Sequence, residues 1–436
     1  MTSVEIGFAS IAFILFFIYT GMHVALAFCF VSLFGVWAIR GSFEQASKLL
    51  ALAASDAVSG YDFGVIPLFV LMGMLVSVAE LGRDAFVAAN AILGRIKGGL
   101  GIATVGANAV FAAVTGVSIA SAAVFTRIAV PEMIRLGYRP RFAVGVVAGS
   151  SVLGMLIPPS LLLIVFGLLA EQSIGDLFIA GVIPGLLLAV VFSLMILALA
   201  TFMPSYVQVP TGAKVEDDGL GLIGATIRLI PLLGLAGLVI GGIYAGWFTP
   251  TESGAVGALG AFVLAAARRK LTWKGLWQVL VETGQITVSI MFLIIAANIY
   301  SRLIALSGMP GVLESWVGNQ HMGFYALLII YSIIVVLLGT LIDGVSIMLI
   351  MVPIFLPLVK TFDVNLIWFG IVTVLATEIG LLTPPMGLSV FVIKSTLADP
   401  RITLNDIFIG AAPYAAVMFA VLLLIIFVPK IALVLL

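Results

Sequence analysis

The chain has 436 residues, of which 63% are hydrophobic and only 9% are charged. Soluble domains contain about a quarter charged residues, so the composition indicates a polytopic membrane protein. The 20 basic and 20 acidic residues balance, and a net charge of zero gives no sign of nucleic-acid binding. The single cysteine, Cys29, excludes a disulfide framework or a cysteine metal cluster within the chain, and the two histidines argue against zinc. The N-terminus lacks a basic segment ahead of its apolar sequence, so we predict no cleavable signal peptide.

The first half of the chain is a succession of apolar segments, several of them near the ~20 residues that cross a bilayer. The uncharged stretch at 6–39 is too long for one simple span, and Thr20-Gly21 marks either a kink or a turn in it. Thr115-Gly116 divides the uncharged stretch 98–126 into two half-length helices meeting at a tip, which is the pattern of a re-entrant hairpin. The other expected elements are amphipathic helices at 42–56 and 83–97, spans at 63–79 and 177–203, and a broken helix at 142–170.

A polar linker at 204–219 separates this half from a second half with the same order of elements. Two apolar segments flank Thr249-Pro250-Thr251-Glu252, and a second hairpin has its tip at Asp343-Gly344. The expected elements are apolar helices at 229–251 and 253–267, an amphipathic helix at 268–282, a span at 283–301, a hairpin at 320–360, a broken helix at 366–398 and a final span at 407–429.

Two pairs of consecutive prolines, Pro158-Pro159 and Pro384-Pro385, interrupt apolar sequence. Proline lacks an N–H and clashes with the preceding turn, so each pair predicts a helix that breaks and resumes. Broken backbone at membrane depth is tolerated where it is buried in protein or lines a wet cavity. In a carrier, a substrate or ion site is the usual reason for such a break.

Three pairs of similar motifs, each pair separated by nearly the same number of residues, indicate an internal duplication. The offset in the numbering is 384 − 158 = 226 for the two proline pairs and 344 − 116 = 228 for the Gly-Val-Ser tips starting at Gly116 and Gly344. It is 308 − 82 = 226 for the weaker pair Gly82 and Gly308. The predicted fold is therefore an all-α polytopic membrane protein of two repeats, each with a re-entrant hairpin and a broken helix. The predicted division is a first repeat at 1–203 (scaffold 1–60, hairpin and broken helix 98–172), the linker at 204–219, and a second repeat at 220–436 (scaffold 220–282, hairpin and broken helix 320–398, final helix 403–436).

The distribution of basic residues predicts that the two repeats are inverted. Cytoplasmic loops of membrane proteins carry an excess of Lys and Arg. The ends of the second hairpin carry only Lys360, whereas the ends of the first carry five basic residues: Arg95, Lys97, Arg135, Arg139 and Arg141. The first hairpin should then open to the cytoplasm and the second to the opposite side, a layout typical of secondary carriers.

Five long motifs carry a family resemblance: AGSSVLGMLIPPS (148–160), GGIYAGWFTPTESGAV (241–256), LIDGVSIMLIMVPIFLPL (341–358), EIGLLTPPMGLSVFVIK (378–394) and the tail 398–436. With these motifs, nearly the whole chain resembles the large membrane subunit of tripartite ATP-independent periplasmic (TRAP) transporters. The resemblance implies an elevator-type carrier, in which a transport domain moves against a scaffold. It implies sodium-coupled uptake of a small organic anion, such as a dicarboxylate or sialic acid, across the inner membrane. The implied partners are a small membrane (Q) subunit, a periplasmic substrate-binding protein and the lipid bilayer, and the only implied cofactor is Na⁺ as coupling ion.

The hairpin tips and helix breaks are the candidate binding sites. Glycine allows the chain to turn tightly there, and both tips and breaks leave backbone carbonyls free for a sodium ion. The predicted sodium ligands are Gly116, Val117, Ser118, Gly154, Ile157, Pro158, Asp343, Gly344, Val345, Ser346, Gly380 and Thr383. Helix N-termini at the breaks suit a carboxylate. The residues predicted at the substrate are Ser150, Ser160, Glu378, Pro385 and Ser389.

Three acidic residues, Glu252, Asp343 and Glu378, lie within apolar runs. An ionisable group in a membrane helix costs at least ~2.5 kcal/mol at the helix centre, which favours a functional role. An interfacial position or a buried hydrogen-bonded pair is the alternative for each. The duplication pairs Asp343 with Thr115, so only one tip carries a carboxylate; we expect Asp343 to bind sodium or to hold the loop that does.

Other classes of function remain open at this point. A sodium/organic-anion symporter of the same architecture that works without a binding protein is the main alternative. An intramembrane enzyme would leave the duplication unexplained, and an ion channel would not need two symmetric hairpins.

Overall fold

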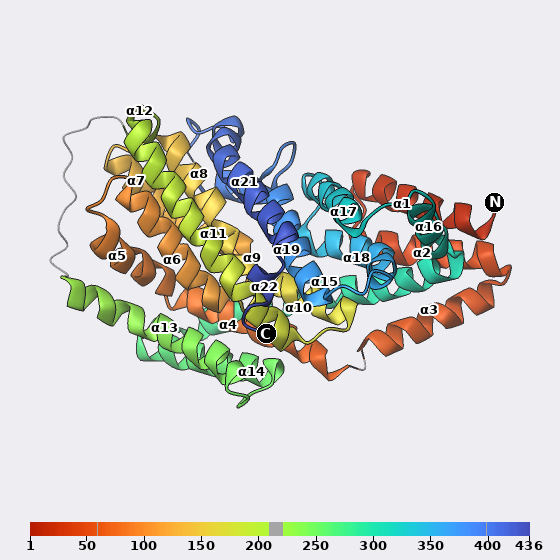
Figure 1. Cartoon of the computed structure of the whole chain (residues 1–436). Coiled ribbons are helices and arrows are strands. Elements are labelled where there is room, and N and C mark those ends of the chain that lie inside the picture. Colours follow the sequence, from red (N-terminus) through yellow and green to blue (C-terminus); the bar gives the residue numbers. More distant parts are fainter. Residues whose placement is uncertain (59, 209–220, 398) are drawn as a thin grey trace.

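The computed structural model describes residues 1–58, 60–208, 221–397 and 399–436. Its secondary structure in these ranges consists of helices and one isolated bridge between Tyr138 and Gln208 (Figure 1). The elements of the first half are α1 (Ser3–Tyr19), α2 (Val24–Arg40), α3 (Phe43–Val58), the 3₁₀-helix η1 (Tyr61–Gly64), α4 (Val65–Val78), α5 (Leu81–Leu93), α6 (Gly99–Thr115), α7 (Ser118–Arg135), α8 (Pro140–Ser151), α9 (Leu153–Leu156), α10 (Leu161–Ala170), α11 (Ile174–Phe202) and α12 (Pro204–Val207). Residues 209–219 of the predicted linker lie outside the described residues.

The second half repeats this order. Its elements are α13 (Leu222–Tyr244), α14 (Pro250–Ala267), α15 (Trp273–Ser307), α16 (Met309–Asn319), α17 (Phe324–Gly339), α18 (Gly344–Lys360), α19 (Leu366–Leu382), α20 (Leu388–Leu397), α21 (Leu404–Phe427) and α22 (Lys430–Leu433). The starts of α14, α18 and α19 follow those of α2, α7 and α8 by one common offset (250 − 24 = 344 − 118 = 366 − 140 = 226). The duplication predicted from the sequence therefore extends to the starts of these three pairs of helices.

This common offset corrects the predicted pairing of the two hairpin tips. Val117 is the N-cap of α7 and Asp343 is the N-cap of α18, and their numbers differ by the same amount (343 − 117 = 226). Asp343 thus corresponds to Val117 and not to Thr115, and the Gly-Val-Ser echo is displaced by two positions (228 − 226 = 2). Gly116 has a φ of +65°, whereas Gly344 is the first residue of a right-handed helix and is absent from the positive-φ glycines of the described residues. Only the first tip needs the left-handed freedom of glycine.

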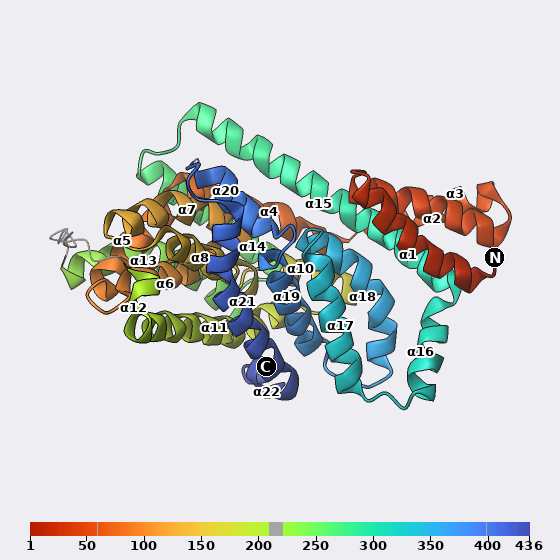
Figure 2. The same cartoon turned by 90° about the horizontal axis from the view of Figure 1, so that it is seen from above.

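The structure decides two further points about the scaffold helices. Thr20-Gly21 forms a turn, with Gly21 at φ +90°, so the stretch 6–39 is the antiparallel pair α1 and α2. The amphipathic helix predicted at 268–282 and the span predicted at 283–301 are wrong as separate elements, because α15 runs through both for 35 residues (Figure 2). In the first half Gly60 and Gly64 flank the break between α3 and α4, but the equivalent residues 286–290 are ITVSI and contain no glycine to interrupt the helix.

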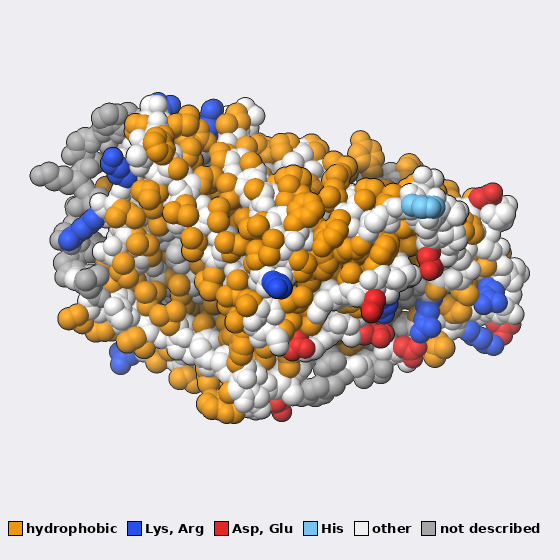
Figure 3. Space-filling view, in the orientation of Figure 1, with side chains coloured by type: hydrophobic (Ala, Val, Ile, Leu, Met, Phe, Trp, Pro, Cys, Tyr) orange, Lys and Arg blue, Asp and Glu red, His pale blue; other side chains and the backbone are white. Residues whose placement is uncertain are grey.

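The hairpins and broken helices are surrounded by longer helices. α14 packs along α4, α15 along α2, and α21 along α8. Residues 368–382 of α19 are all buried, and so are residues 142–167 of the first broken helix. Hydrophobic side chains cover most of the face in Figure 3, while charged side chains lie mainly toward its margins. Among the described residues, six helices are long and apolar enough to cross a membrane, or seven if α4 and α5, bent by 62°, count as one span.

Candidate functional site

The first hairpin tip is packed directly on the first proline break. The carbonyl oxygen of Gly116 accepts a hydrogen bond from the Leu161 amide at 3.1 Å. A Cβ on Gly116 would lie 2.6 Å from the carbonyl oxygen of Pro159, and a Cβ on Gly154 would lie 3.2 Å from the Ser118 amide nitrogen. Tip and break therefore form one unit, in which Gly116 is required by close approach as well as by conformation and Gly154 is closely packed.

The first break contains carbonyl groups that no helix uses. α9 ends at Leu156 and α10 begins at Leu161, with a cis bond between Pro158 and Pro159. Among the hydrogen bonds of the described residues, none is accepted by the carbonyl oxygens of Ile157, Pro158 or Pro159, although these residues are buried. Buried carbonyls are nearly always paired, so oxygens left free here are suited to an ion.

The second unit is built in a similar way but docks differently. The Met386 amide donates to the Thr340 carbonyl oxygen at 3.0 Å, and a Cβ on Gly380 would lie 2.5 Å from the Cα of Gly339. A Cβ on Gly344 would lie 3.0 Å from Thr377 Cγ2. The second tip is thus closely packed against α19, with little space for a side chain at Gly344.

The Thr383 hydroxyl, predicted as a sodium ligand, donates to the Ile379 carbonyl oxygen at 2.7 Å. The Thr383 amide donates to the Gly380 carbonyl oxygen at 2.9 Å. The hydroxyl oxygen keeps free lone pairs, so both hydrogen bonds hold Thr383 at the break without excluding an ion there.

Asp343 caps the helix that follows the second tip. Its Oδ1 accepts from the Ser346 amide at 3.1 Å, and its Oδ2 accepts from the Ser346 hydroxyl. Asp343 is half-buried, while Val345 and Ser346 are buried. The carboxylate therefore caps α18 and holds the tip in shape.

The two breaks differ in their exposure. Every residue from Gly154 to Ser160 is buried, whereas Pro384, Pro385 and Met386 are exposed. The second break therefore reaches the surface of the protein, and the first is enclosed by it.

A hydrogen bond joins the two halves at their centre. The Ser118 hydroxyl, at the start of α7, donates to Oε1 of Glu378 in α19 at 3.3 Å. The other carboxyl oxygen, Oε2, is buried and has no hydrogen-bond partner among the described residues, and the same holds for the hydroxyl of Ser389 in α20. Ser118, predicted at sodium, and Glu378, predicted at the substrate, are therefore in contact.

Sequence analysis missed a buried polar network next to this contact. Asn108 of α6 donates from Nδ2 to the Ser150 hydroxyl at 2.6 Å and accepts at Oδ1 from the Ser121 hydroxyl at 2.7 Å. The Ser150 hydroxyl in turn donates to the Val146 carbonyl oxygen at 2.7 Å. The hydroxyl of Ser150, predicted at the substrate, is thus engaged in holding α6, α7 and α8 together. A single asparagine in an uncharged hairpin arm was the signal for this network.

Ser160, the other serine predicted at the first break, is the N-cap of α10. Its hydroxyl accepts from the Leu163 amide at 3.3 Å and donates to the Met155 carbonyl oxygen. Ser160 therefore connects the two sides of the break through its hydroxyl and caps the N-terminus of α10.

A glycine contact between α8 and α21 was also missed. A Cβ on Gly145 would lie 2.2 Å from the carbonyl oxygen of Gly410, and a Cβ on Gly149 would lie 2.2 Å from the ring of Tyr414. The spacing Gly145-x-x-x-Gly149 is the small-residue pattern that lets membrane helices approach closely, and it was the available signal. This contact fixes the final helix against the first broken helix.

Glu252 lies at the end of a helix and not in a buried hydrogen-bonded pair. It is exposed, and its carboxylate accepts from the Thr249 amide at 2.8 Å in a capping box at the start of α14. Within the described residues, no group of three or more His, Cys, Asp or Glu side chains is placed to hold a metal ion.

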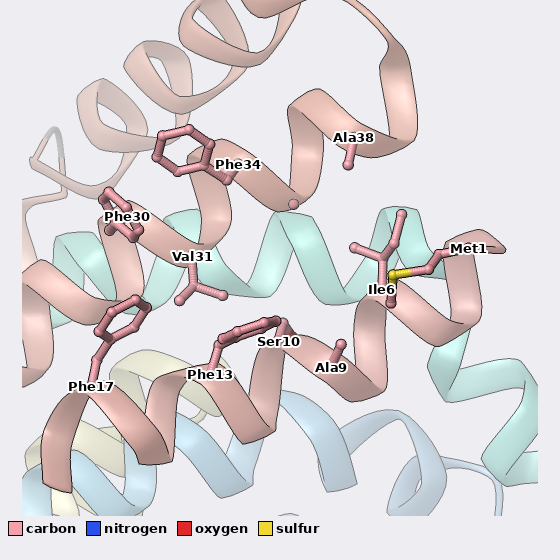
Figure 4. Close-up of a pocket in the computed structure, with 11 residues that line it drawn as sticks. Met1, Ile6, Ala9, Ser10, Phe13, Phe17, Phe30, Val31, Phe34 and Ala38 are labelled. Carbon is pink, nitrogen blue, oxygen red and sulfur yellow. The ribbon is translucent and has the colours of Figure 1, made fainter. Parts of the chain in front are cut away.

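An apolar cavity of about 260 Å³ lies between α1 and α2 (Figure 4). Its one polar side chain, Ser10, donates its hydroxyl to the Gly7 carbonyl oxygen at 2.6 Å. Its lining includes aromatic rings of both helices: Phe13, Phe17, Phe30 and Phe34. It contains none of the predicted site residues and offers no group to an organic anion, so the hairpin units remain the candidate site.

A membrane-spanning helical chain with two hairpins docked on two proline breaks has the architecture of a secondary carrier. The sequence profile of the tripartite ATP-independent periplasmic transporter, DctM component, matches residues 11–431. The chain therefore belongs to this family and is a transporter subunit, not an enzyme.

Individual relatives agree with this assignment. The C4-dicarboxylate TRAP transporter large permease protein DctM of Pseudomonas aeruginosa is 33% identical over 88% of each chain. The sialic acid TRAP transporter large permease protein SiaM of Vibrio cholerae is 29% identical over 96% of this chain and 95% of its own length. The crystal structure of the Alcanivorax borkumensis YdaH transporter is 14% identical and superimposes with a TM-score of 0.57 over 88% of each chain, which shows that the fold is similar.

Proposed function

We propose that this chain carries a small organic anion across the inner membrane together with sodium ions, by an elevator movement of the hairpin units against the outer helices. The observation that carries the proposal is the pair of hairpin–break units, which recur at one constant offset in the chain, the first of them with free backbone carbonyls at its break. Two such half-helix sites at the centre of an inverted repeat are the usual places for coupling ion and substrate.

The proposed sodium ligands are those predicted at the two units. The first unit offers its free carbonyls at Ile157 and Pro158 together with the tip residues Gly116, Val117 and Ser118. The second offers carbonyls near Gly380 and Thr383 together with a tip held by Asp343. Sodium is a hard cation that takes oxygen ligands, and both units supply them.

The proposed substrate site lies at the second break. Pro385 is exposed there, and the Ser389 hydroxyl, near the start of α20, is unpaired among the described residues. Helix α20 begins at Leu388, and the positive end of its dipole there favours a carboxylate. Relatives named for C4-dicarboxylates and for sialic acid support an organic acid of this kind.

The proposed partners are a small membrane subunit and a periplasmic substrate-binding protein. One relative, the isethionate TRAP transporter permease protein DctMQ of Oleidesulfovibrio alaskensis, is longer, and this chain covers 59% of it. A second, longer relative is the sialic acid TRAP transporter permease protein SiaT of Haemophilus influenzae, of which the chain covers 60%. Both relatives contain a further segment that this chain does not match, and this supports a separate small subunit as its partner.

Uptake into proteoliposomes tests the proposal. Transport should need an inward sodium gradient, the small subunit and added binding protein loaded with the organic acid. Sodium-driven uptake without the binding protein would instead establish the stand-alone symporter. Uptake that ignores sodium would overturn the coupling.

We predict that the two hairpins open to opposite sides of the membrane. Arg139 and Lys360 are both exposed, at the start of α8 and the end of α18. In a Cys29→Ser background, Arg139→Cys should react with a membrane-impermeant maleimide from the cytoplasmic side and Lys360→Cys from the other side. Labelling of both from one side would contradict the inverted repeat.

Substitutions of Asp343 separate its capping role from sodium binding. Asparagine caps helices about as well as aspartate, so Asp343→Asn should keep the bond from the Ser346 amide while it removes the charge. If the charge serves sodium, the sodium concentration for half-maximal uptake should rise about tenfold, which corresponds to about 1.4 kcal/mol. The half-saturating substrate concentration at high sodium should change little.

Asp343→Ala is the matched variant, because it removes both the charge and the cap and should cost about 1 kcal/mol more in stability. An unchanged sodium dependence in Asp343→Asn would leave Asp343 as a cap only. The sodium site at the second unit would then consist of backbone carbonyls and Thr383.

A further inference from the structure

Glu378 is the one acidic residue that is buried among the described residues, with 1% of its surface exposed. Oε1 accepts the Ser118 hydroxyl at 3.3 Å, and Oε2 is buried without a partner. None of the ion pairs of the described residues includes Glu378. A carboxylate at this place has an unsatisfied oxygen and an uncompensated charge.

Such a group needs a compensating partner, because burying an unpaired charge is strongly unfavourable. The N-terminus of α7 faces Oε1 through Ser118 and contributes part of a positive charge, but it leaves Oε2 free. An organic anion would add a second negative charge and cannot be the partner. The charge is then compensated either by a cation or by a proton on the carboxyl group itself.

We propose that Glu378 is the anionic ligand of a third sodium site, located between the first hairpin tip and the second broken helix. The inference rests on the sodium-coupled function proposed above. Ser118 supplies a hydroxyl oxygen next to the carboxylate, and the carboxylate oxygen Oε2 has all its lone pairs available. An oxygen set with one negative charge suits a hard monovalent cation.

The place of this site in the fold gives it a specific role. Ser118 belongs to the tip that packs on Gly154, and Glu378 lies just before Gly380, which packs on Gly339 of the second hairpin. An ion between them would touch both hairpin–break units, which also pack on each other where Gly344 lies against Leu162. Its binding would stabilise both units at once. Sodium binding at one unit would then favour sodium binding at the other.

Thermal unfolding tests the site without a transport assay. The carrier, purified with its small subunit, is unfolded at increasing NaCl, with choline chloride keeping the ionic strength constant. A ligand that binds only the folded state raises the unfolding temperature with the logarithm of its concentration, in proportion to the number of sites. With two other sites present, Glu378→Gln should reduce the slope by about one third.

The sodium-free condition gives a second readout of opposite sign. Without sodium, Glu378→Gln should be at least as stable as the wild type, because the variant has no unpaired charge to bury. Glu314→Gln removes an exposed carboxylate of the same size in α16 and is the matched control, which should change neither the slope nor the sodium-free stability. Ser118→Ala should weaken the sodium response in the same direction as Glu378→Gln. If Glu378→Gln does not fold, Glu378→Asp, which keeps the charge, should retain a sodium response that is shifted to higher concentration.

The other outcomes overturn the inference. A full sodium response in Glu378→Gln would mean that the carboxylate binds no sodium. An equal loss of stability with and without sodium would make Glu378 a structural partner of Ser118. A raised half-saturating substrate concentration with an unchanged sodium response would place Glu378 at the substrate, as predicted from the sequence. If the wild type itself shows no sodium response and no sodium-driven uptake, the proposed function fails and not this site alone.

Discussion

Replacing Gly116 by valine is expected to reduce sodium-driven uptake to background. Gly116 has a φ of +65°, a conformation that costs other residues about 1–2 kcal/mol. A Cβ there would also lie 2.6 Å from the carbonyl oxygen of Pro159, which is backbone and cannot move without shifting the whole break. If 2 kcal/mol of this cost falls on the sodium-binding conformation, the affinity for sodium drops about thirtyfold. The initial rate of uptake into proteoliposomes, measured over a range of sodium concentrations, gives the size of the effect.

Gly106 offers the matched control in the same helix. A Cβ on Gly106 would have its nearest contact at 3.9 Å, with the Leu93 side chain. Gly106→Ala should therefore transport normally. Gly116→Ala should fall between Gly106→Ala and Gly116→Val, since it has the strain and the carbonyl contact but not the valine methyl groups. Normal sodium dependence of uptake by Gly116→Val would show that the tip is not a closely packed ion site.

Gly145→Ala is expected to destabilise the folded carrier by about 1–3 kcal/mol, the usual range for overpacking. The added methyl group would lie 2.2 Å from the carbonyl oxygen of Gly410, so α8 and α21 would have to separate. Separation would also displace the first broken helix, to which α8 belongs, and uptake should fall with stability. Thermal unfolding of the purified protein measures the first effect, and uptake per folded molecule measures the second.

Gly237 of α13 provides the comparison for this substitution. It is exposed, and a Cβ there meets no atom of the described residues within 4 Å. Gly237→Ala should be neutral or stabilising by up to about 1 kcal/mol, because alanine favours the helix. Equal unfolding temperatures for Gly145→Ala and Gly237→Ala would mean that the α8–α21 contact contributes little to the fold.

The sequence by itself determined the class of protein and the places where its helices break. Composition indicated a membrane protein because charged residues are too few for a soluble surface. The breaks at Pro158-Pro159 and Pro384-Pro385 follow from the covalent chemistry of proline, and the duplication follows from their spacing. These features are local or periodic, so they can be recognised without knowing which segments touch.

The tertiary structure decided what depends on contacts between distant residues. Ser118 and Glu378 are 260 residues apart in the chain, and no pattern in the sequence places one beside the other. The same is true of the contact between Gly145 and Gly410, and of the Asn108 network that engages Ser150. The correspondence between residues of the two hairpin tips also required the structure. The repeated Gly-Val-Ser sequence suggested one alignment of the tips, but the helix N-caps at Val117 and Asp343 show an alignment shifted by two residues. Local chemistry fixes where a helix must stop, but only packing fixes which atoms meet at the stop, because that depends on how all the helices fill space together.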